Sequence, residues 1–334
     1  MNALLSTFVP IWVLTAIGYL VSRSGLLGDQ AEAVLGRFVF HVAMPAALFT
    51  MVARTSLSSF ANASMLAFVA GTVVASGLGF LASGWLGRAT ADRAIGGMAA
   101  GYVNSGNLGI PVSVQVFGDA SFVAPVMLFQ VLLVTPVILA LVDAGRRGPQ
   151  GDGGDGNDGE VAARGSGGSA WDRVRRTLLL PVRNPIIMAS ALGCVFSVAG
   201  WQLPQAVGKS VELLGGAGVP TALVTLGMSL HTRPAVQAGE ARRARAELTV
   251  TVLVKNLLQP LVAYAVGAWV LDLPPSRLLV AVLFSALPTA QNVFIYARQY
   301  DRSTALPRDA VLCTTLVSML TLTLVTWLLG PVPG

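Results

Sequence analysis

Charged side chains are scarce in this sequence of 334 residues, because Asp, Glu, Lys and Arg together make up only 11% of it. Soluble domains usually carry about 25%. Hydrophobic residues account for 54%, and apolar runs of roughly twenty residues, enough for a helix to cross a hydrocarbon core of about 30 Å, recur along the chain. The shortage of charge therefore predicts an integral membrane protein rather than a soluble one.

Cysteine and the common catalytic motifs are also scarce or absent. The two cysteines, Cys194 and Cys313, both lie within apolar runs, so neither a disulfide framework nor a metal site is implied. The sequence contains no HExxH or GxSxG motif, and Ser105 has no base nearby. A membrane enzyme is therefore disfavoured, and we expect no cofactor and no metal.

We predict ten membrane helices from the apolar runs. Between the fifth and the sixth, roughly at 144–182, lies a polar stretch with the run GDGGDGNDGE, whose composition cannot bury a core. We interpret it as a flexible linker between a first half at 1–143 and a second half at 183–334. The predicted helices lie at about 3–22, 33–52, 61–86, 94–117, 121–142, 184–201, 208–230, 247–271, 278–299 and 308–329.

The distribution of basic residues predicts how these helices are oriented. The loops after the odd-numbered helices contain 17 Arg residues, whereas the loops on the other side contain only Arg54, Lys209 and Arg277. Cytoplasmic loops carry the excess of Lys and Arg. We therefore predict a multi-pass protein of the inner (plasma) membrane with both termini outside and the 144–182 linker in the cytoplasm. Because the basic residues gather in these loops, we expect no nucleic-acid partner, despite a pI of about 9.9.

An internal repeat relates the two halves. PIWVLTAIGYLVSRSG (10–25) resembles PIIMASALGCVFSVAG (185–200), and MPAALFT (44–50) resembles VPTALVT (219–225), both at an offset of 175 residues. Five helices per half is an odd number, so the second half must enter the membrane from the opposite side. Inverted repeats of this kind are typical of secondary transporters, which bind substrate at broken helices near the midplane. The predicted fold class is an all-α membrane protein of ten transmembrane helices, arranged as two inverted five-helix repeats.

Helices four and nine are predicted to be broken and to cross. The fourth contains Gly, Asn and Pro in its middle, the ninth contains Pro, Thr, Gln and Asn at the equivalent depth, and such residues favour non-helical backbone. Each break would expose the N-terminus of a half-helix, which suits a carboxylate. The candidate substrate-binding residues in the two helices are Asn104, Ser105, Asn107, Gly109, Pro111, Pro288, Thr289, Gln291 and Asn292.

Each of these features has a simpler interpretation when taken alone. A Pro in a membrane helix is often only a kink, and a single Asn often only forms a hydrogen bond to a neighbouring helix. The matched positions in two inverted halves favour a binding site.

Lys255 is a basic residue inside the eighth predicted helix, where a charge costs about 2.5–3.5 kcal/mol on insertion scales. Three interpretations are open for it. Lys255 is a fixed cation in the scaffold beside the anion site, or the partner of an acid, or a side chain that snorkels to the interface.

At these residues the chain resembles the auxin efflux carrier family, which includes the plant PIN-FORMED exporters and many bacterial transporters and is related to the bile acid/sodium symporter-like superfamily. The resemblance covers the predicted helices but not the linker. It is carried by RFVFHVAMP (37–45), Asn104 with Gly109-Ile110-Pro111, Lys255 with Pro260, Gln130 thirteen residues before Asp143, and Pro288, Phe294, Ala297, Arg298 and Tyr300.

The resemblance implies a scaffold domain, a transport domain that holds the crossing helices, and elevator-like alternating access for carboxylate anions. It adds Gln130 to the candidate substrate-binding residues. The implied substrate is an auxin or a dicarboxylate such as malate or malonate. Val293 stands where the plant motif has a second Pro, and Asn107 adds polarity. Both departures favour the bacterial branch.

The sequence therefore predicts a secondary transporter that moves a small organic carboxylate across the lipid bilayer, with Lys255 as electrostatic support. An anion channel and an anion-sensing membrane receptor are the alternatives, because a channel does not saturate and a receptor binds without flux. A homodimer is one candidate for the oligomeric state.

The predicted orientation can be tested with a reporter. Alkaline phosphatase fused after Gly334 should be active, because it folds only in an oxidising compartment and the C-terminus is predicted to lie outside. The same reporter fused within 144–182 serves as the control and should be inactive. Activity of a cytoplasmic reporter at Gly334 would contradict the orientation.

Overall fold

The structure is a computed structural model that describes residues 2–54, 62–118, 122–146, 185–231 and 238–330. Within these ranges the chain is helical and has no strands, and its extended backbone is limited to an isolated bridge between Val103 and Thr289. The all-α prediction is confirmed for this part of the chain. Helix α8 continues to Arg146, three residues into the predicted linker, and the rest of that linker lies outside the described residues.

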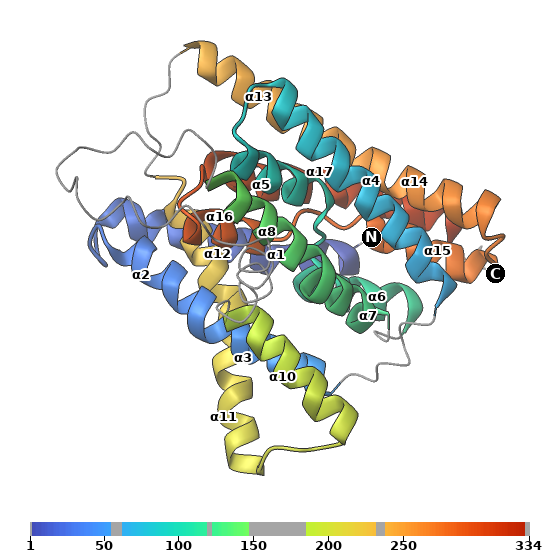
Figure 1. The fold of residues 1–334 in the computed structure, drawn as a ribbon, viewed down its shortest axis with the longest axis horizontal. Helices are drawn as coiled ribbons and strands as arrows, with labels where there is room; N and C mark the ends of the chain where they lie inside the picture. The colour runs from blue at the N-terminus through green and yellow to red at the C-terminus, as the bar shows by residue number, and fades with distance from the viewer. Residues whose placement is uncertain (1, 55–61, 119–121, 147–184, 232–237, 331–334) are drawn as a thin grey trace, which may run out of the picture.

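The first half of the chain contains three helices that are interrupted or joined by π-helical turns. Residues 31–53 form one such helix (Figure 1). The elements are α1 (Asn2–Ser24), α2 (Ala31–Phe38), a π-turn (Val39–Ala43), α3 (Met44–Ala53), α4 (Ala63–Trp85), α5 (Thr90–Gly101), a π-turn (Ser105–Gly109), α6 (Ile110–Phe117), α7 (Val123–Phe129), a π-turn (Gln130–Val134) and α8 (Thr135–Arg146).

The second half follows the same general order. Its elements are α10 (Pro185–Ala199), α11 (Gln205–Gly216), α12 (Gly218–Met228), α13 (Ala238–Leu253), a π-turn (Val254–Leu258), α14 (Gln259–Ala265), a π-turn (Val266–Val270), α15 (Pro275–Ser285), α16 (Asn292–Gln299) and α17 (Ala305–Leu329).

Six helices in the described part of the chain are long and apolar enough to cross a membrane, judged by length and composition. Of the other four predicted spans, two coincide with the apolar helices α1 and α10, whose apolar stretches Phe8–Ser24 and Pro185–Ala199 lie in the described part of the chain. The other two are broken in the middle, between α5 and α6 and between α15 and α16. The six long helices are Ala31–Ala53, Ala63–Trp85, Val123–Val142, Gln205–Met228, Gly239–Val270 and Ala305–Leu329.

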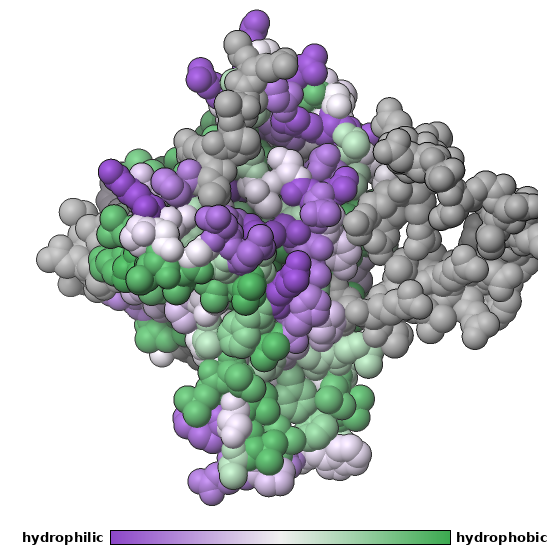
Figure 2. All heavy atoms as spheres, turned by 90° about the vertical axis from the view of Figure 1, so that its left-hand side faces the viewer, coloured by the Kyte–Doolittle hydropathy of each residue, from purple (hydrophilic) through white to green (hydrophobic). Residues whose placement is uncertain are grey.

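The surface of the molecule matches an apolar environment. Figure 2 shows hydrophobic residues covering much of one lobe, with hydrophilic residues gathered at the upper end and along one side. Trp85, Trp269 and Trp327, each near a helix end, are 82%, 79% and 78% exposed. Tryptophan is enriched at membrane–water interfaces, and exposed apolar area on this scale is stable only against lipid or a partner.

The helices form two groups. In the first, α1 packs along α12, and α3 packs against α10 and α11; in the second, α4 packs against α5, α14 and α15. Figure 1 shows α3, α10 and α11 in the lower middle, α1 and α12 near the centre, and α4, α14 and α15 at the upper right. Residues Gly71, Ala75, Gly79 and Ser83, spaced by four, are all buried on α4. A Cβ at Gly79 would meet Gly96 O at 2.8 Å, so these small residues do form a close helix-packing face.

Two helix contacts in the first group recur at the spacing of the sequence repeat. A Cβ on Gly18 would collide with the carbonyl oxygen of Val224, and a Cβ on Gly193 would lie 3.0 Å from the carbonyl oxygen of Phe49. An offset of 175 residues converts one contact into the other. The glycines therefore let α1 approach α12, and α10 approach α3, in the same way.

These contacts predict an overpacking effect. Gly18→Val and Gly193→Val should each destabilise the protein by about 1–3 kcal/mol, measured as a lower thermal unfolding midpoint of the purified protein. Gly77→Val is the control, because a Cβ on Gly77 of α4 meets nothing within 4 Å. Equal midpoints for all three variants would contradict the close packing.

Candidate functional site

The two broken helices cross through their non-helical segments. Val103 and Thr289 pair as an antiparallel bridge, the Asn104 N–H donates to the Pro288 carbonyl at 2.8 Å, and the Ala290 N–H donates to the Tyr102 carbonyl at 3.2 Å. Backbone that leaves the helix at membrane depth is tolerated only where its polar groups are bonded or line a cavity. At the crossing, backbone polar groups of each broken helix are therefore hydrogen-bonded to the other.

The local sequence explains where each helix stops. Helix α5 ends at Gly101, and Tyr102 is already extended, with φ −82° and ψ 114°. A Cβ on Gly101 would collide with Ser76, so only glycine fits this close approach to α4. Pro288 lacks an N–H and cannot continue α15. The chain resumes its helices only at Ser105 and at Asn292.

Both resumed helices begin at the crossing. The side-chain oxygen of Asn104 accepts a hydrogen bond from the Asn107 N–H at 3.3 Å and so caps the first of them, whereas Gln291 makes no side-chain cap for α16. The first N–H groups of a helix have no acceptor within the helix and carry a partial positive charge. Two helix starts therefore face one small region.

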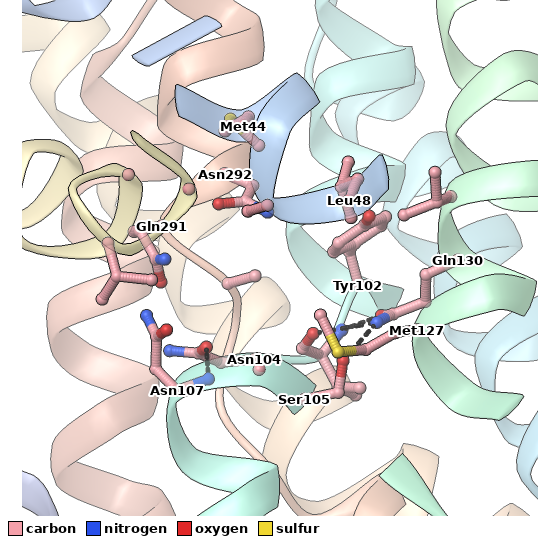
Figure 3. A pocket seen from close by; sticks show the side chains of 18 residues that line it. Met44, Leu48, Tyr102, Asn104, Ser105, Asn107, Met127, Gln130, Gln291 and Asn292 are labelled. Carbon is pink, nitrogen blue, oxygen red and sulfur yellow. Dashed lines mark hydrogen bonds between the residues drawn. The ribbon is translucent and has the colours of Figure 1, made fainter. Parts of the chain in front are cut away.

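A cavity of about 90 Å³ lies at this region. No charged side chain occurs among the described residues that line it, so polarity comes from amides, one hydroxyl, one phenol and backbone. In Figure 3 Asn104, Asn107 and Gln291 lie on one side and Ser105, Gln130 and Met127 on the other. The lining residues are Met44, Ala47, Leu48, Tyr102, Val103, Asn104, Ser105, Gly106, Asn107, Met127, Gln130, Val131, Gly215, Gly218, Val219, Ala290, Gln291 and Asn292.

Six of the ten candidate substrate-binding residues line this cavity: Asn104, Ser105, Asn107, Gln130, Gln291 and Asn292. The other four do not line it.

Those four residues lie beside the cavity and stabilise the segments that surround it. Gly109 packs against Phe284, and Pro111 begins α6. The Pro288 carbonyl is used in the crossing. Thr289 is fully buried, where its hydroxyl donates to the Ala99 carbonyl at 2.7 Å and its N–H donates to the Thr314 hydroxyl at 3.0 Å.

The side-chain amide of Gln130 binds the backbone at the break in the fourth predicted helix. Its Oε1 accepts from the Val103 N–H at 2.6 Å, and its Nε2 donates to the Val103 carbonyl at 3.1 Å and to the Ser105 hydroxyl at 2.9 Å. The side chain is 1% exposed. Gln130 therefore positions the lining segment, although it also borders the cavity.

Two lining side chains have polar atoms that the described part of the chain leaves without a hydrogen-bond partner. These atoms are Nδ2 of Asn107 and Oε1 of Gln291, and both are buried. An unpaired buried polar group costs about 1–3 kcal/mol. Such atoms beside a cavity are suited to a ligand, and the Asn107 amide supplies a donor.

Lys255 lies behind the crossing. Its ammonium group is fully buried and donates to Gln259 Oε1 at 2.5 Å and to the Ser285 carbonyl at 3.3 Å. Gln259 in turn donates to the Gly101 carbonyl at 3.2 Å and to the Thr72 hydroxyl at 3.1 Å. The pair therefore binds the C-terminal carbonyls of both α5 and α15, where a cation is favoured by the helix dipoles.

One interpretation of Lys255 is wrong, because full burial excludes a snorkelling side chain. The π-turn that carries Lys255 packs on α4, α5 and α17, in the helix group that holds the crossing. No carboxylate in the described ranges lies within salt-bridge distance of it.

Sequence analysis missed the opposite wall of the cavity. Met44, Ala47 and Leu48 come from α3, Gly215 from α11, and Gly218 and Val219 from the start of α12. A signal was present: Met44 and Val219 are the first residues of the repeated motifs MPAALFT and VPTALVT, at the same offset of 175. Apolar residues in a repeat do not by themselves distinguish core packing from a cavity wall.

The contacts of Gln130 predict a loss of stability on mutation. Gln130→Leu should lower the thermal unfolding midpoint, because it leaves the buried Val103 N–H unpaired at about 1–3 kcal/mol; the Val103 carbonyl still accepts from the Ser105 N–H at 2.9 Å. Gln130→Glu should have a smaller effect, since it keeps an acceptor for the N–H. Met127→Leu, on the same wall, is the control and should leave the midpoint unchanged. A Gln130→Leu midpoint equal to that of the control would contradict the clamp.

Comparisons with known proteins relate the chain to transporters. A "Putative malonate transporter" of Rhizobium meliloti (strain 1021) is 27% identical over 324 residues, covering 94% of this chain and 92% of that protein. An "Uncharacterized transporter" of Methanothermobacter thermautotrophicus is 26% identical over 95% of this chain and 96% of its own length. "Auxin efflux carrier component 8" of Arabidopsis thaliana is 29% identical over 35% of this chain and 32% of that protein.

A family model described as "Membrane transport protein" matches residues 3–326, nearly the whole chain. The family and the relatives are named for transport rather than for enzymatic activity. The chain therefore belongs to the membrane transport protein family, that of the auxin efflux carriers, and is a multi-pass membrane transporter.

Proposed function

We propose that this chain is a secondary carrier that moves a small organic carboxylate across the inner membrane by alternating access, with the cavity at the crossing as its substrate site. The observation that carries the proposal is the pairing of Val103 with Thr289, because it brings two helix starts to one uncharged polar cavity. The Asn107 side-chain amide supplies a donor for an anion there, and the partial positive charge at the two helix starts favours one.

The proposed site binds an anion by partial charges instead of a full positive charge. A helix N-terminus contributes about 0.3–1 kcal/mol to holding an anion, and up to about 2 kcal/mol when partly buried. Two such termini with amide donors give a moderate total. Binding of moderate strength is compatible with release of the anion on the other side of the membrane.

The size of the cavity favours a compact substrate. Pockets for drug-sized ligands are typically about 300–1,000 Å³, whereas this cavity is about 90 Å³. The relative matched over 94% of the chain is named for malonate, and the auxin efflux carrier component 8 matches only 35%. A dicarboxylate of a few carbons is thus preferred to an auxin-like aromatic acid.

Alternating access follows from the two helix groups. The cavity is lined on one side by α3, α11 and α12, and on the other by the crossing segments. These walls belong to different groups of packed helices, so a sliding movement of one group along the other would expose the same site to each side in turn. We propose the group of α1, α3, α10 and α12 as the scaffold.

We also propose the ten-span inverted repeat with both termini outside. The equivalent contacts of Gly18 with Val224 and of Gly193 with Phe49 support it, because one offset relates them across the two halves. Trp85 and Trp269, at the ends of α4 and of the π-turn after α14, are both strongly exposed and support a matching depth for the two halves.

Substitution of asparagine by aspartate tests the anion site. Asn104→Asp keeps an oxygen that caps the Asn107 N–H, and Asn107→Asp replaces the unpartnered donor by an acceptor. Both add a negative charge to the cavity, so saturable uptake and counterflow of labelled malonate in proteoliposomes should fall at least tenfold, about 1.4 kcal/mol.

Asn62→Asp is the matched control, since Asn62 caps α4 through an N–H bond from Ser64 at 3.0 Å and lies outside the cavity lining. Unchanged kinetics in both cavity variants would refute the site. Flux that does not saturate and lacks counterflow would instead indicate a channel, and binding without flux a receptor.

The role of Lys255 predicts a charge-dependent effect. Lys255→Met keeps the length but removes the cation from the carbonyl ends of α5 and α15, so it should reduce malonate uptake more than Lys255→Arg does. Lys209→Met, at an exposed position of α11, is the control and should transport normally. Normal uptake by Lys255→Met would mean that the anion depends on backbone N–H groups and asparagines alone.

A further inference from the structure

A second, larger cavity of about 480 Å³ lies at the far end of α16. Helix α16 begins at the central cavity with Asn292 and lines the second cavity with Ile295 and Arg298, about 5 and 9 Å further along the helix axis. The opposite wall is α2. The lining residues are Ala33, Gly36, Arg37, Ile295, Arg298, Gln299, Asp301, Arg302 and Thr304.

The charges of the two cavities differ sharply. Among the described residues, no charged side chain lines the central cavity, whereas three arginines and one carboxylate, Asp301, line the second. Arg37 is exposed, and Arg298 and Arg302 are partly buried. Arg302 is oriented by its Nε, which donates to the Tyr300 carbonyl at 3.1 Å.

Arg298 is held in place by the neighbouring helix. Its guanidinium group forms an ion pair with Glu32 of α2, with side chains 27% and 13% exposed. The arginine passes over Gly36, where an added Cβ would lie 3.0 Å from Arg298 Cδ. Glycine at this position therefore makes room for the arginine, and the ion pair joins α2 to α16 across the cavity.

We propose that this cavity is a second binding site for a small carboxylate anion, an entry or exit station in which the anion binds Arg302 and Arg37 and competes with Glu32 for Arg298. The guanidinium fork matches a carboxylate in geometry and charge. The identity of the anion as the transported one rests on the proposed function. Competition with Glu32 would also loosen the contact between α2 and α16 while the anion passes.

A phospholipid phosphate offers the same chemistry as a carboxylate. The cavity lies on the side that the basic loops predict to be cytoplasmic, where lipid headgroups are also present. We favour the small anion because α16 lines both cavities. Its first residue borders the central cavity, and its later residues border the second. The experiment separates the two sources.

A thiol reporter measures occupancy without measuring transport. Thr304→Cys is introduced in a Cys194→Ser/Cys313→Ser background and reconstituted in phosphatidylcholine nanodiscs. Its reaction rates with an anionic and a cationic methanethiosulfonate are compared with those of Gln205→Cys, an exposed position at the start of α11. The anionic-to-cationic rate ratio should be at least threefold higher at Thr304→Cys, and malonate should slow its reaction in a saturable way.

Charge substitutions then test the ligands. Arg302→Gln should raise the malonate concentration that gives half protection at least threefold, and Arg302→Lys should raise it less. Glu32→Gln should lower that concentration about twofold to fivefold, because it removes the competing carboxylate. Absence of protection by malonate, or protection that Arg302→Gln and Glu32→Gln leave unchanged, would overturn the site.

Two further arms separate this inference from its alternatives. Protection by malonate should persist when Asn104→Asp is added, since that substitution changes only the central cavity; its disappearance would assign the protection to the central cavity and overturn the second site. Protection by phosphatidylglycerol in place of malonate would assign the arginines to lipid and also overturn it. Persistent protection in a protein that transports neither malonate nor other small carboxylates would refute the proposed function while leaving the second anion site in place.

Discussion

Two short stretches of backbone leave the helix in the middle of this protein, and their need for hydrogen-bond partners organises the residues around them. An unsatisfied N–H or C=O in a membrane interior costs several kcal/mol. The Asn104 N–H donates to the Pro288 carbonyl and the Ala290 N–H to the Tyr102 carbonyl. Gln130 bonds both backbone groups of Val103. Lys255 and Gln259 bond the carbonyls where α15 and α5 stop. The crossing is thus stabilised from three directions.

This arrangement separates polar residues that position the cavity from those available to a ligand. Gln130 and Thr289 use their side-chain atoms on neighbouring backbone. Asn107 and Gln291 keep a polar atom without a partner in the described structure. The same distinction applies to charge. The ammonium group of Lys255 is hydrogen-bonded behind the crossing, whereas Arg37 and Arg302 line the second cavity at the far end of α16. A neutral central cavity beside a basic one suits an anion that must bind and then leave.

The pattern of the sequence predicted the breaks correctly because their causes are local. Glycine and proline disfavour helix through their own backbone, and Asn is a favoured helix cap, so Gly101, Pro288 and Asn104 act within their own segments. Asn104 is one residue after Val103, whereas Asn292 is three residues after Thr289, so the bridge does not make them equivalent. Only the pairing of the two segments sets that register.

The sequence by itself determined the membrane class, the helix ranges, the family and the two broken helices, since hydrophobic length, basic loops and helix-breaking residues act within one segment. Tertiary structure alone decided which walls enclose the cavity and which polar atoms remain free. In the sequence, Met44 and Val219 are ordinary apolar residues. Only the placement of α3 and α12 opposite the crossing shows that they line the cavity. From the sequence, Lys255 was interpreted as a charge near the substrate. Only the fold shows that it binds residues 4 and 30 positions away in the chain. Hydrogen bonds and cavities join residues distant in the chain, and helix packing determines which of them meet.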